Sequence, residues 1–255
     1  MVTIILPVSR DDYLRRVFTQ LELMNCDQTK VNLLCYVDGD ILLMEKARNL
    51  TINSKFEQRL CVFRGKGQPN VGSVKRRRQR IADIHNEIKE LLEPCDYVFL
   101  VEDDTLVPIN ALEKLLNNFY IHPHTGIISG TQLGRWGYLH QGLWSVDDVY
   151  ETNTITSLKA GDGLQKIDAA GFYCGLIKYQ NYINHTFKPF EDAMGPDVDF
   201  GLMMRKEGLA NYADLSIKCA HLYNRGIINF SDSEIVQVQL KRTPDVRFGW
   251  MTSSL

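Results

Sequence analysis

Acidic side chains follow two short apolar runs of this 255-residue chain, at the point where each run ends. Asp38 comes directly after one run, and Glu102, Asp103 and Asp104 come directly after another. Three adjacent carboxylates repel one another unless a cation or hydrogen-bond donors offset their charge. Strand alternation would put Glu102 and Asp104 on the same side, where their oxygens suit Mg²⁺ or Mn²⁺. A divalent metal site is one interpretation, and a solvated acidic turn before Pro108 is the other.

A basic cluster follows Gly72 at the start of a predicted helix. Five cations fall within residues 75–80, at the helix end where the macrodipole disfavours positive charge. Exposed backbone N–H groups, together with side chains such as Arg76 and Arg80, would bind a compensating phosphate. A solvated basic face is the alternative. A nucleic-acid-binding stripe is a third interpretation, weakened by the net charge of -2 from 29 basic and 31 acidic residues.

Four further carboxylates lie within residues 191–199, around a Gly-Pro turn that enters a predicted helix. Asp197 and Asp199 belong to this group. These carboxylates would either stabilise the helix N-terminus through its dipole or supply a general base. His221 follows a mixed apolar run, and a lone histidine in such a place is more often structural than a metal ligand.

The elements that would position these side chains alternate between short β-branched runs and longer segments with helical spacing. This alternation is typical of a βαβ sheet, in which ligands bind outside the carboxyl ends of the strands. The predicted strands cover residues 2–8, 31–37, 60–63 and 97–101. The predicted helices cover residues 11–24, 41–50, 73–92 and 111–119. In the third helix, the apolar residues at 81, 84, 88, 91 and 92 form a face that we expect to pack on the sheet.

The pattern becomes less regular after about residue 125. Short strands are predicted at 126–130 and 171–177, and a helix is predicted at 197–207. Asn110 and Glu113 are placed like a capping box at the start of the fourth helix. Because no Pro/Gly/Ser linker separates the halves, the sequence predicts a single α/β domain over residues 1–255.

The composition is that of a globular chain, with 44% hydrophobic and 24% charged residues, and no apolar run approaches the roughly 20 residues of a membrane helix. The first nine residues lack a basic segment and a small-residue cleavage site, so they predict a strand rather than a signal peptide. We therefore expect a cytoplasmic protein. Six cysteines are spread singly without Cys-x-x-Cys spacing, which favours reduced core thiols.

Taken together, these residues resemble the GT-A glycosyltransferases, and most of all the family 2-like and Anp1-like members, over residues 2–225. Residues 2–8, which include Pro7, look like the first nucleotide-binding strand, and Asp38 looks like the residue that contacts the donor base. Residues 70–72 and the basic helix are similar to the segment that closes over the nucleotide and diphosphate. Residues 99–104 look like the DxD motif, with Glu102 in the place of its first Asp.

Downstream motifs match in the family's order. Residues 168–177, which begin at Asp168, are similar to the strand beside the donor sugar and acceptor. Residues 195–200 resemble the family's Glu-Asp-x-Asp-Phe helix, with Pro196 in the place of the Glu. The resemblance implies that Asp197 is the catalytic base, that Asp199 is the second candidate, and that His221 is a further metal ligand.

The resemblance also implies the fold and the ligands. The fold would be a Rossmann-like, mixed and mainly parallel sheet flanked by helices, with a nucleotide-sugar-binding half (1–107) and an acceptor-binding half (108–255). Glu102, Asp104 and His221 would hold Mn²⁺ or Mg²⁺. The donor, a UDP-sugar or another nucleotide-sugar, would be held by six residues: Pro7, Asp38, Arg76, Arg80, Asp103 and Asp168.

The expected activity is metal-dependent transfer of a hexosyl or pentosyl group to an acceptor hydroxyl, with inversion. A nucleotidyltransferase is the enzymatic alternative, but it usually carries a glycine-rich loop where this chain has Ser9 and Arg10. A nucleotide-sugar-binding module without turnover is the third hypothesis.

The sequence leaves the acceptor open among glycans, lipid-linked sugars, proteins and modified nucleic acid bases. An aromatic segment would either stack on a sugar or base or pack within the protein. Its residues are Trp136, Tyr138, His140, Trp144 and Tyr150.

Overall fold

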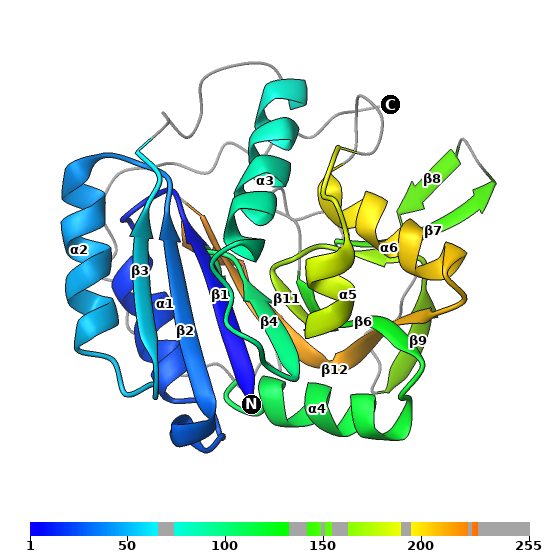
Figure 1. The fold of residues 1–255 in the computed structure, drawn as a ribbon. Coiled ribbons are helices and arrows are strands. Elements are labelled where there is room, and N and C mark those ends of the chain that lie inside the picture. Colours follow the sequence, from blue (N-terminus) through cyan, green and yellow to red (C-terminus); the bar gives the residue numbers. More distant parts are fainter. Residues whose placement is uncertain are drawn as a thin grey trace, which may run out of the picture.

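Four apolar runs form the parallel part of the central sheet in the computed structural model of the chain (Figure 1). β1 (Val2–Val8) pairs with both β2 (Val31–Val37) and β4 (Tyr97–Val101), and β2 pairs with β3 (Arg59–Phe63). Almost every residue of β1 and β2 is buried, as expected for parallel strands covered on both faces. The predicted bounds of β1, β2 and β4 are confirmed, and β3 begins one residue earlier than predicted.

The structure describes residues 1–65, 74–132, 142–148, 151–154, 163–189, 195–223 and 226–228. The second half completes a mixed ten-stranded sheet in the order β13-β12-β6-β11-β4-β1-β2-β3, with β5 and β9 paired to β12. β11 is antiparallel to β4 and β6, whereas β12 is parallel to β6. These strands are β5 (Thr105–Leu106), β6 (Thr125–Gln132), β9 (Leu164–Ile167), β11 (Cys174–Lys178), β12 (Ala210–Tyr223) and β13 (Gly226–Ile228).

A smaller sheet lies beside the central one and has the order β10-β7-β8. Its strands are β7 (Leu143–Asp148), β8 (Glu151–Thr154) and β10 (Ala169–Ala170). Its strand β10 contacts the last helix that the structure describes.

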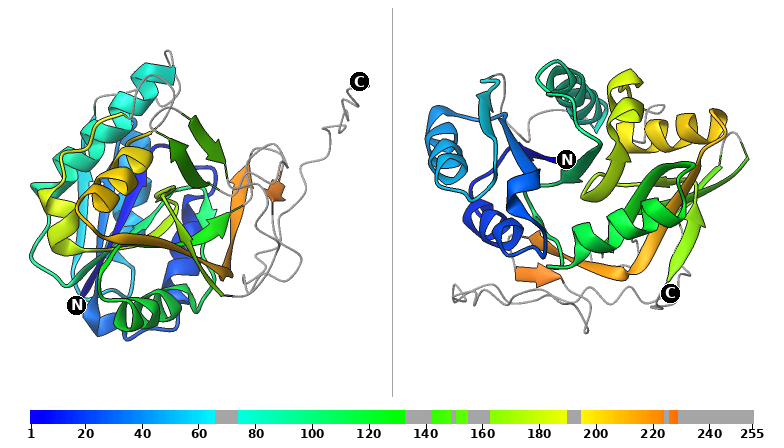
Figure 2. Two further views of the ribbon diagram at one scale, coloured as in Figure 1. Left: turned by 90° about the vertical axis from the view of Figure 1, so that its right-hand side faces the viewer. Right: turned by 60° about the horizontal axis from the view of Figure 1, so that its bottom comes forward.

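Helices cover both faces of the central sheet (Figure 2). One face carries α1 (Leu14–Glu22), α2 (Ile41–Ile52) and α4 (Ala111–Ile121), and a short 3₁₀ turn, η1 (Gln28–Lys30), precedes β2. The other face carries α3 (Val74–Lys89), α5 (Tyr179–Asn184) and α6 (Pro196–Lys206). Among the described residues, we find no helix with the length and apolarity needed to cross a membrane.

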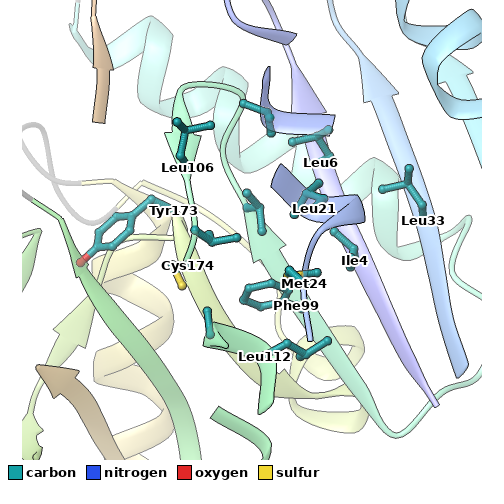
Figure 3. Close-up of a cluster of buried hydrophobic side chains, with 14 of the residues drawn as sticks. Ile4, Leu6, Leu21, Met24, Leu33, Phe99, Leu106, Leu112, Tyr173 and Cys174 are labelled. Carbon is teal, nitrogen blue, oxygen red and sulfur yellow. The ribbon is translucent and has the colours of Figure 1, made fainter. Parts of the chain in front are cut away.

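Alternation along the strands divides the apolar side chains between two cores. Ile4, Leu6 and Phe99 pack under α1 and α4, in the cluster drawn in Figure 3. Ile5 and Leu100 point to the opposite face and pack under α3 and α6. Burial of these side chains from water is the main force that holds the helices on the sheet.

Three expectations about local structure need correction. The strand β12 was not predicted, because its 14 residues include buried polar groups such as Asn211 and Asp214, and its register with β6 is irregular. Asn110 begins α4 but its side chain makes no capping hydrogen bond, so the capping box with Glu113 is not formed. Ile81 was expected to pack on the sheet but is 38% exposed.

The long strand β12 joins the second half of the chain to the acidic edge. It pairs with β5, directly after the acidic run, with His221 opposite Thr105. The N–H of Leu222 donates to the carbonyl of Asp104 at 2.7 Å. This pairing explains why a histidine far along the chain lies beside carboxylates of the first half.

The helix α6 is held against the small sheet by a close contact at Gly201. A Cβ atom at Gly201 would lie 2.7 Å from the backbone of Ala169 and from the carbonyl oxygen of Asp168. The buried amide of Asn211 donates to the carbonyls of Gly201 and Asp168 at 2.8 and 2.7 Å. The position of α6 therefore depends on a residue without a side chain.

We predict that Gly201→Ala lowers the free energy of unfolding by about 1–3 kcal/mol, because the added methyl overpacks the contact with β10. Helix propensity alone would predict the opposite, a rise of about 1 kcal/mol in the free energy of unfolding. Urea unfolding of the variant measures the difference, and Lys206→Ala on the exposed face of the same helix is the control. Equal or greater stability of Gly201→Ala would contradict the contact.

Candidate active site

A cleft of about 460 Å³ opens at the carboxyl ends of β1, β2 and β4, where ligands collect in sheets of this kind. Its walls come from the strand ends, from α3 and from the start of α6. Predicted site residues from five separate segments meet there. They are Pro7, Asp38, Arg80, Glu102, Asp103 and Asp197.

Asp38 lies at the end of β2 and is held by two arginines. Its Oδ2 accepts hydrogen bonds from Arg64 Nη1 at 3.2 Å and from Arg80 Nε, and its backbone carbonyl accepts from Arg80 Nη2 at 3.0 Å. Its side chain is 1% exposed, so the carboxylate requires these partners. Its Oδ1 has no hydrogen-bond partner in the described part of the chain.

Glu87 of α3 extends this network to the neighbouring strands. It accepts hydrogen bonds from Arg64 Nη2 at 3.0 Å and from the hydroxyl of Tyr36. Burial raises the pKa of Tyr36 well above its usual range, and the hydrogen bond to Glu87 adds to the shift. The network fixes α3 relative to the ends of β2 and β3, and so fixes one wall of the cleft.

Asp103 is tied to the segment that follows β1. Its Oδ2 accepts hydrogen bonds from the backbone N–H groups of Ser9 and Arg10 at 2.7 and 3.1 Å, and from the Ser9 hydroxyl at 3.1 Å. Burial raises the pKa of Asp103 above its ordinary value, although the Arg10 guanidinium opposes the shift. Arg10 itself lines the cleft and was not singled out from the sequence.

Asp104 is fully buried beneath Asp103 and contacts His221. His221 Nε2 lies 3.3 Å from Asp104 Oδ2, and the same oxygen lies 3.2 Å from Arg10 Nη2. Glu102 is exposed and lines the cleft. Within the described ranges, no three His, Cys, Asp or Glu side chains form a group that could hold a metal ion.

The carboxylate oxygen of Asp104 nevertheless suits Mn²⁺ or Mg²⁺, and the imidazole nitrogen of His221 suits a transition-metal ion such as Mn²⁺. Magnesium in particular is usually bound by one or two protein carboxylates together with substrate phosphates and water. The pair therefore fits an ion that takes its other ligands from a bound diphosphate. The assignment of Glu102, Asp104 and His221 as metal ligands stays a prediction.

Asp197 lies in the first turn of α6, against the Gly195 backbone. A Cβ atom at Gly195 would lie 2.2 Å from Asp197 Oδ1 and 3.0 Å from Arg78 Nη1, so both side chains converge there. Asp197 Oδ1 is buried and has no hydrogen-bond partner among the residues described. Burial raises the pKa of Asp197, and the positive charge of Arg78 opposes the rise.

Asp199, two residues further along α6, belongs to a different environment. Its Oδ2 lies 3.3 Å from His185 Nε2, and its Oδ1 lies 3.9 Å from Lys188 Nζ. It does not line the cleft, and the ring of His185 packs on Phe200 and its neighbours. This placement favours Asp197 over Asp199 as the residue that faces a ligand.

Two predicted donor-binding residues lie away from the cleft lining. The carboxylate of Asp168 pairs with Arg205 Nη1 at 2.7 Å. Arg76 is exposed on α3, whereas Arg77 and Arg78 line the cleft beside Arg80. For Asp168 and Arg76, donor binding stays a prediction. The residues of 70–72, 190–194 and most of the aromatic segment (Trp136, Tyr138, His140 and Tyr150) lie outside the described residues.

The floor of the cleft is apolar and includes a neutral histidine. Ile84, Phe172 and His85 line it. Burial lowers the pKa of His85 to about 3, and its Nδ1 lies 2.8 Å from the hydroxyl of Tyr182. At neutral pH, His85 therefore adds no charge to the cleft, and the sequence contains no signal that distinguishes it.

We predict that Asp38→Ala lowers the free energy of unfolding by about 3 kcal/mol, because it leaves buried guanidinium groups without their shared carboxylate. Chemical denaturation monitored by circular dichroism measures this difference. Asp11→Ala, which removes the exposed partner of Lys46, is the matched control and should leave stability almost unchanged. Equal stability of the two variants would be inconsistent with the buried network.

No protein-family model and no curated protein matches the sequence. The mannosyltransferase PcManGT of Pyrobaculum calidifontis, solved with GDP-Man and Mn²⁺, matches with a TM-score of 0.57 and 12% identity, over 84% of this chain and 56% of that one. TarS of S. aureus matches with a TM-score of 0.51 and 11% identity, over 83% of this chain and 34% of that one. TarS 1-349 of S. aureus in complex with UDP-GlcNAc matches with a TM-score of 0.50 and 13% identity, over 83% of this chain and 55% of that one. The chain thus has the predicted α/β fold of glycosyltransferases, and it spans between a third and just over half of the length of these proteins.

Proposed function

We propose that the protein is a glycosyltransferase that moves a sugar from a nucleotide-diphosphate sugar to an acceptor hydroxyl. The observation that carries the proposal is the cleft at the carboxyl edge of the sheet. Four arginines line it (Arg10, Arg77, Arg78 and Arg80), together with carboxylates from β2, β4 and α6. A ligand with negative charge, an apolar part and a reacting centre would match the arginines, the apolar side chains and the carboxylates that line the cleft.

The nucleoside part of the donor would lie at the ends of β1 and β2. Pro7 and Ile84 offer apolar surface there, and Asp38 offers a carboxylate oxygen for an N–H group of the base. Arg64 and Arg80 keep this carboxylate in place, so little conformational freedom is lost on binding. This arrangement suits a UDP-sugar or another nucleotide-sugar.

The diphosphate would lie between α3 and the acidic turn. Arg77 and Arg78 approach this region from the first turns of α3, where backbone N–H groups add positive potential. A divalent ion held by Glu102, Asp104 and His221 would offset the charge that develops on the departing phosphate. We propose Mn²⁺ or Mg²⁺ for this ion.

Asp197 is the base in this proposal. Asp197 lines the cleft, and an acceptor hydroxyl that donates to its carboxylate would be oriented for attack on the sugar. The carboxylate takes the hydroxyl proton as the new glycosidic bond forms on the face opposite the leaving diphosphate. One such displacement inverts the anomeric centre. The transferred group is a hexosyl or pentosyl residue, and the protein acts on it in the cytoplasm.

The first test is thermal stabilisation by UDP, GDP, CMP and dTDP, each with and without Mn²⁺. We expect one nucleotide to raise the melting temperature by several degrees in a Mn²⁺-dependent manner, because a ligand at about 100 times its Kd contributes about 2.7 kcal/mol. Asp104→Ala should abolish the Mn²⁺ dependence. Stabilisation by nucleoside triphosphates alone would favour a nucleotidyltransferase, and stabilisation by none of them would contradict donor binding.

Asp197→Asn should lower kcat by about 10²–10⁴-fold while the nucleotide-induced stabilisation remains. The variant should also be more stable than the wild type at pH 7. Because burial raises the pKa of Asp197, the folded protein favours the protonated acid, and stability is lost as pH rises through that pKa. The gain from asparagine should therefore vanish near pH 4.

Asp199→Asn is the matched comparison within the same helix turn. It removes the partner of His185, so it should lower stability while its kcat stays well above that of Asp197→Asn. Initial rates of sugar release and thermal unfolding at pH 4 and pH 7 provide both readouts. A larger loss of kcat in Asp199→Asn would transfer the base assignment to Asp199.

A further inference from the structure

Arg10 is fixed in place by its own backbone. It follows β1 by two residues, and its N–H and that of Ser9 both donate to Asp103 Oδ2. These hydrogen bonds join residues more than 90 positions apart and leave the Arg10 side chain directed at the acidic turn. The fold therefore fixes the backbone of Arg10 beside the acidic turn, and the side chain starts from there.

The guanidinium of Arg10 bridges two carboxylates of the turn. Its Nε lies 3.3 Å from Asp103 Oδ1, and its Nη2 lies 3.2 Å from Asp104 Oδ2. His221 Nε2 lies 3.3 Å from this same Asp104 oxygen. The oxygen that would coordinate a metal ion together with His221 is thus in contact with an arginine.

Charge explains why an arginine is stable in this place. Asp103 and Asp104 are buried, and buried carboxylates require a positive partner. An arginine guanidinium is not deprotonated in proteins. Arg10 therefore stays charged, and a divalent cation that approached Asp104 would meet a fixed positive charge.

A bound anion would favour a second position of Arg10 within the cleft. The Arg10 side chain is 32% exposed and lines the cleft, so it has room to turn away from Asp104. Arg77 and Arg78 line the same space. Their charges repel a guanidinium that moves toward them, and a bound diphosphate would remove that repulsion and accept hydrogen bonds from Arg10.

We propose that Arg10 is an internal cation that keeps the Asp104–His221 pair from binding a divalent ion until a diphosphate draws its guanidinium into the cleft. The diphosphate part of this inference rests on the proposed function. Metal and diphosphate would then bind cooperatively. The diphosphate would draw the Arg10 charge away from the metal ion, and the metal ion would neutralise the carboxylate that Arg10 leaves. The acidic turn stays neutralised throughout, first by Arg10 and then by the metal.

The test is a Mn²⁺ titration of the metal-free, full-length protein without nucleotide, followed by the electron paramagnetic resonance of free Mn²⁺. We expect weak binding to the wild type and binding about tenfold or more tighter to Arg10→Gln. Arg10→Lys, which keeps the charge, should stay as weak as the wild type. His221→Ala in the Arg10→Gln background should abolish the gain. Equal binding to wild type and Arg10→Gln would overturn the proposal, as would a gain that survives His221→Ala.

A crystal structure of the wild type with UDP in EDTA is the second test, and it does not require the glutamine variant to fold. We expect the Arg10 guanidinium within hydrogen-bond distance of a phosphate and no longer in contact with Asp104. Persistence of the Arg10–Asp104 contact with UDP bound would contradict the proposal. If UDP does not bind while Arg10→Gln still gains Mn²⁺ affinity, the donor assignment fails and the exclusion of metal by Arg10 stands.

Discussion

Compensation of buried negative charge organises the carboxyl edge of the sheet. Asp38, Asp103 and Asp104 are almost completely buried, and an unpaired carboxylate in such a place costs several kcal/mol. The arginines that neutralise them come from three different segments: Arg10 after β1, Arg64 after β3 and Arg80 within α3. Each pair therefore also joins two elements of the fold, and together the pairs define the walls of the cleft.

Asp197 is also buried near an arginine, Arg78, and the contrast with Asp199 is informative. Both carboxylates lie in the first turn of α6, where the helix dipole favours negative charge. Asp199 lies beside His185 and Lys188. Each of the two aspartates has one buried oxygen without a hydrogen bond from the described residues, but only Asp197 lines the cleft, where burial raises its pKa despite the nearby charge of Arg78. Groups left in such unfavourable surroundings are common at catalytic sites, where stability is given up for reactivity.

Sequence patterns are sufficient for the features that depend on local physics. The apolar runs of β1, β2 and β4 can be read directly, and the carboxylates that follow them meet at one edge because parallel strands end there. The pairing of β12 with β5 could not be predicted, because no local pattern specifies which distant strand a segment with buried polar residues will join.

The choice among the arginines of α3 depends on the phase of the helix. Ile84 and Ile88 pack on the sheet. Residues 77, 81 and 85 are four positions apart, so they lie near the same face of the helix, and all three line the cleft. Arg76 does not line the cleft. Phase could have been used to choose Arg77 over Arg76 once the packed face was known. Arg10 carries no such signal, because its partners are set entirely by the tertiary fold.

The β5–β12 pairing has a consequence for the order in which the protein acquires its site during synthesis. His221 lies 117 residues after Asp104, and the strand that carries it pairs beside the acidic turn. The parallel half of the sheet can therefore emerge from the ribosome before His221 has been added to the chain. Contacts between such distant residues are slow to form because a long loop must close first. Until then the acidic turn has Arg10 as a cationic side-chain partner but lacks His221, so the nascent domain passes through a stage in which the parallel strands are complete and the β5–β12 pairing is not.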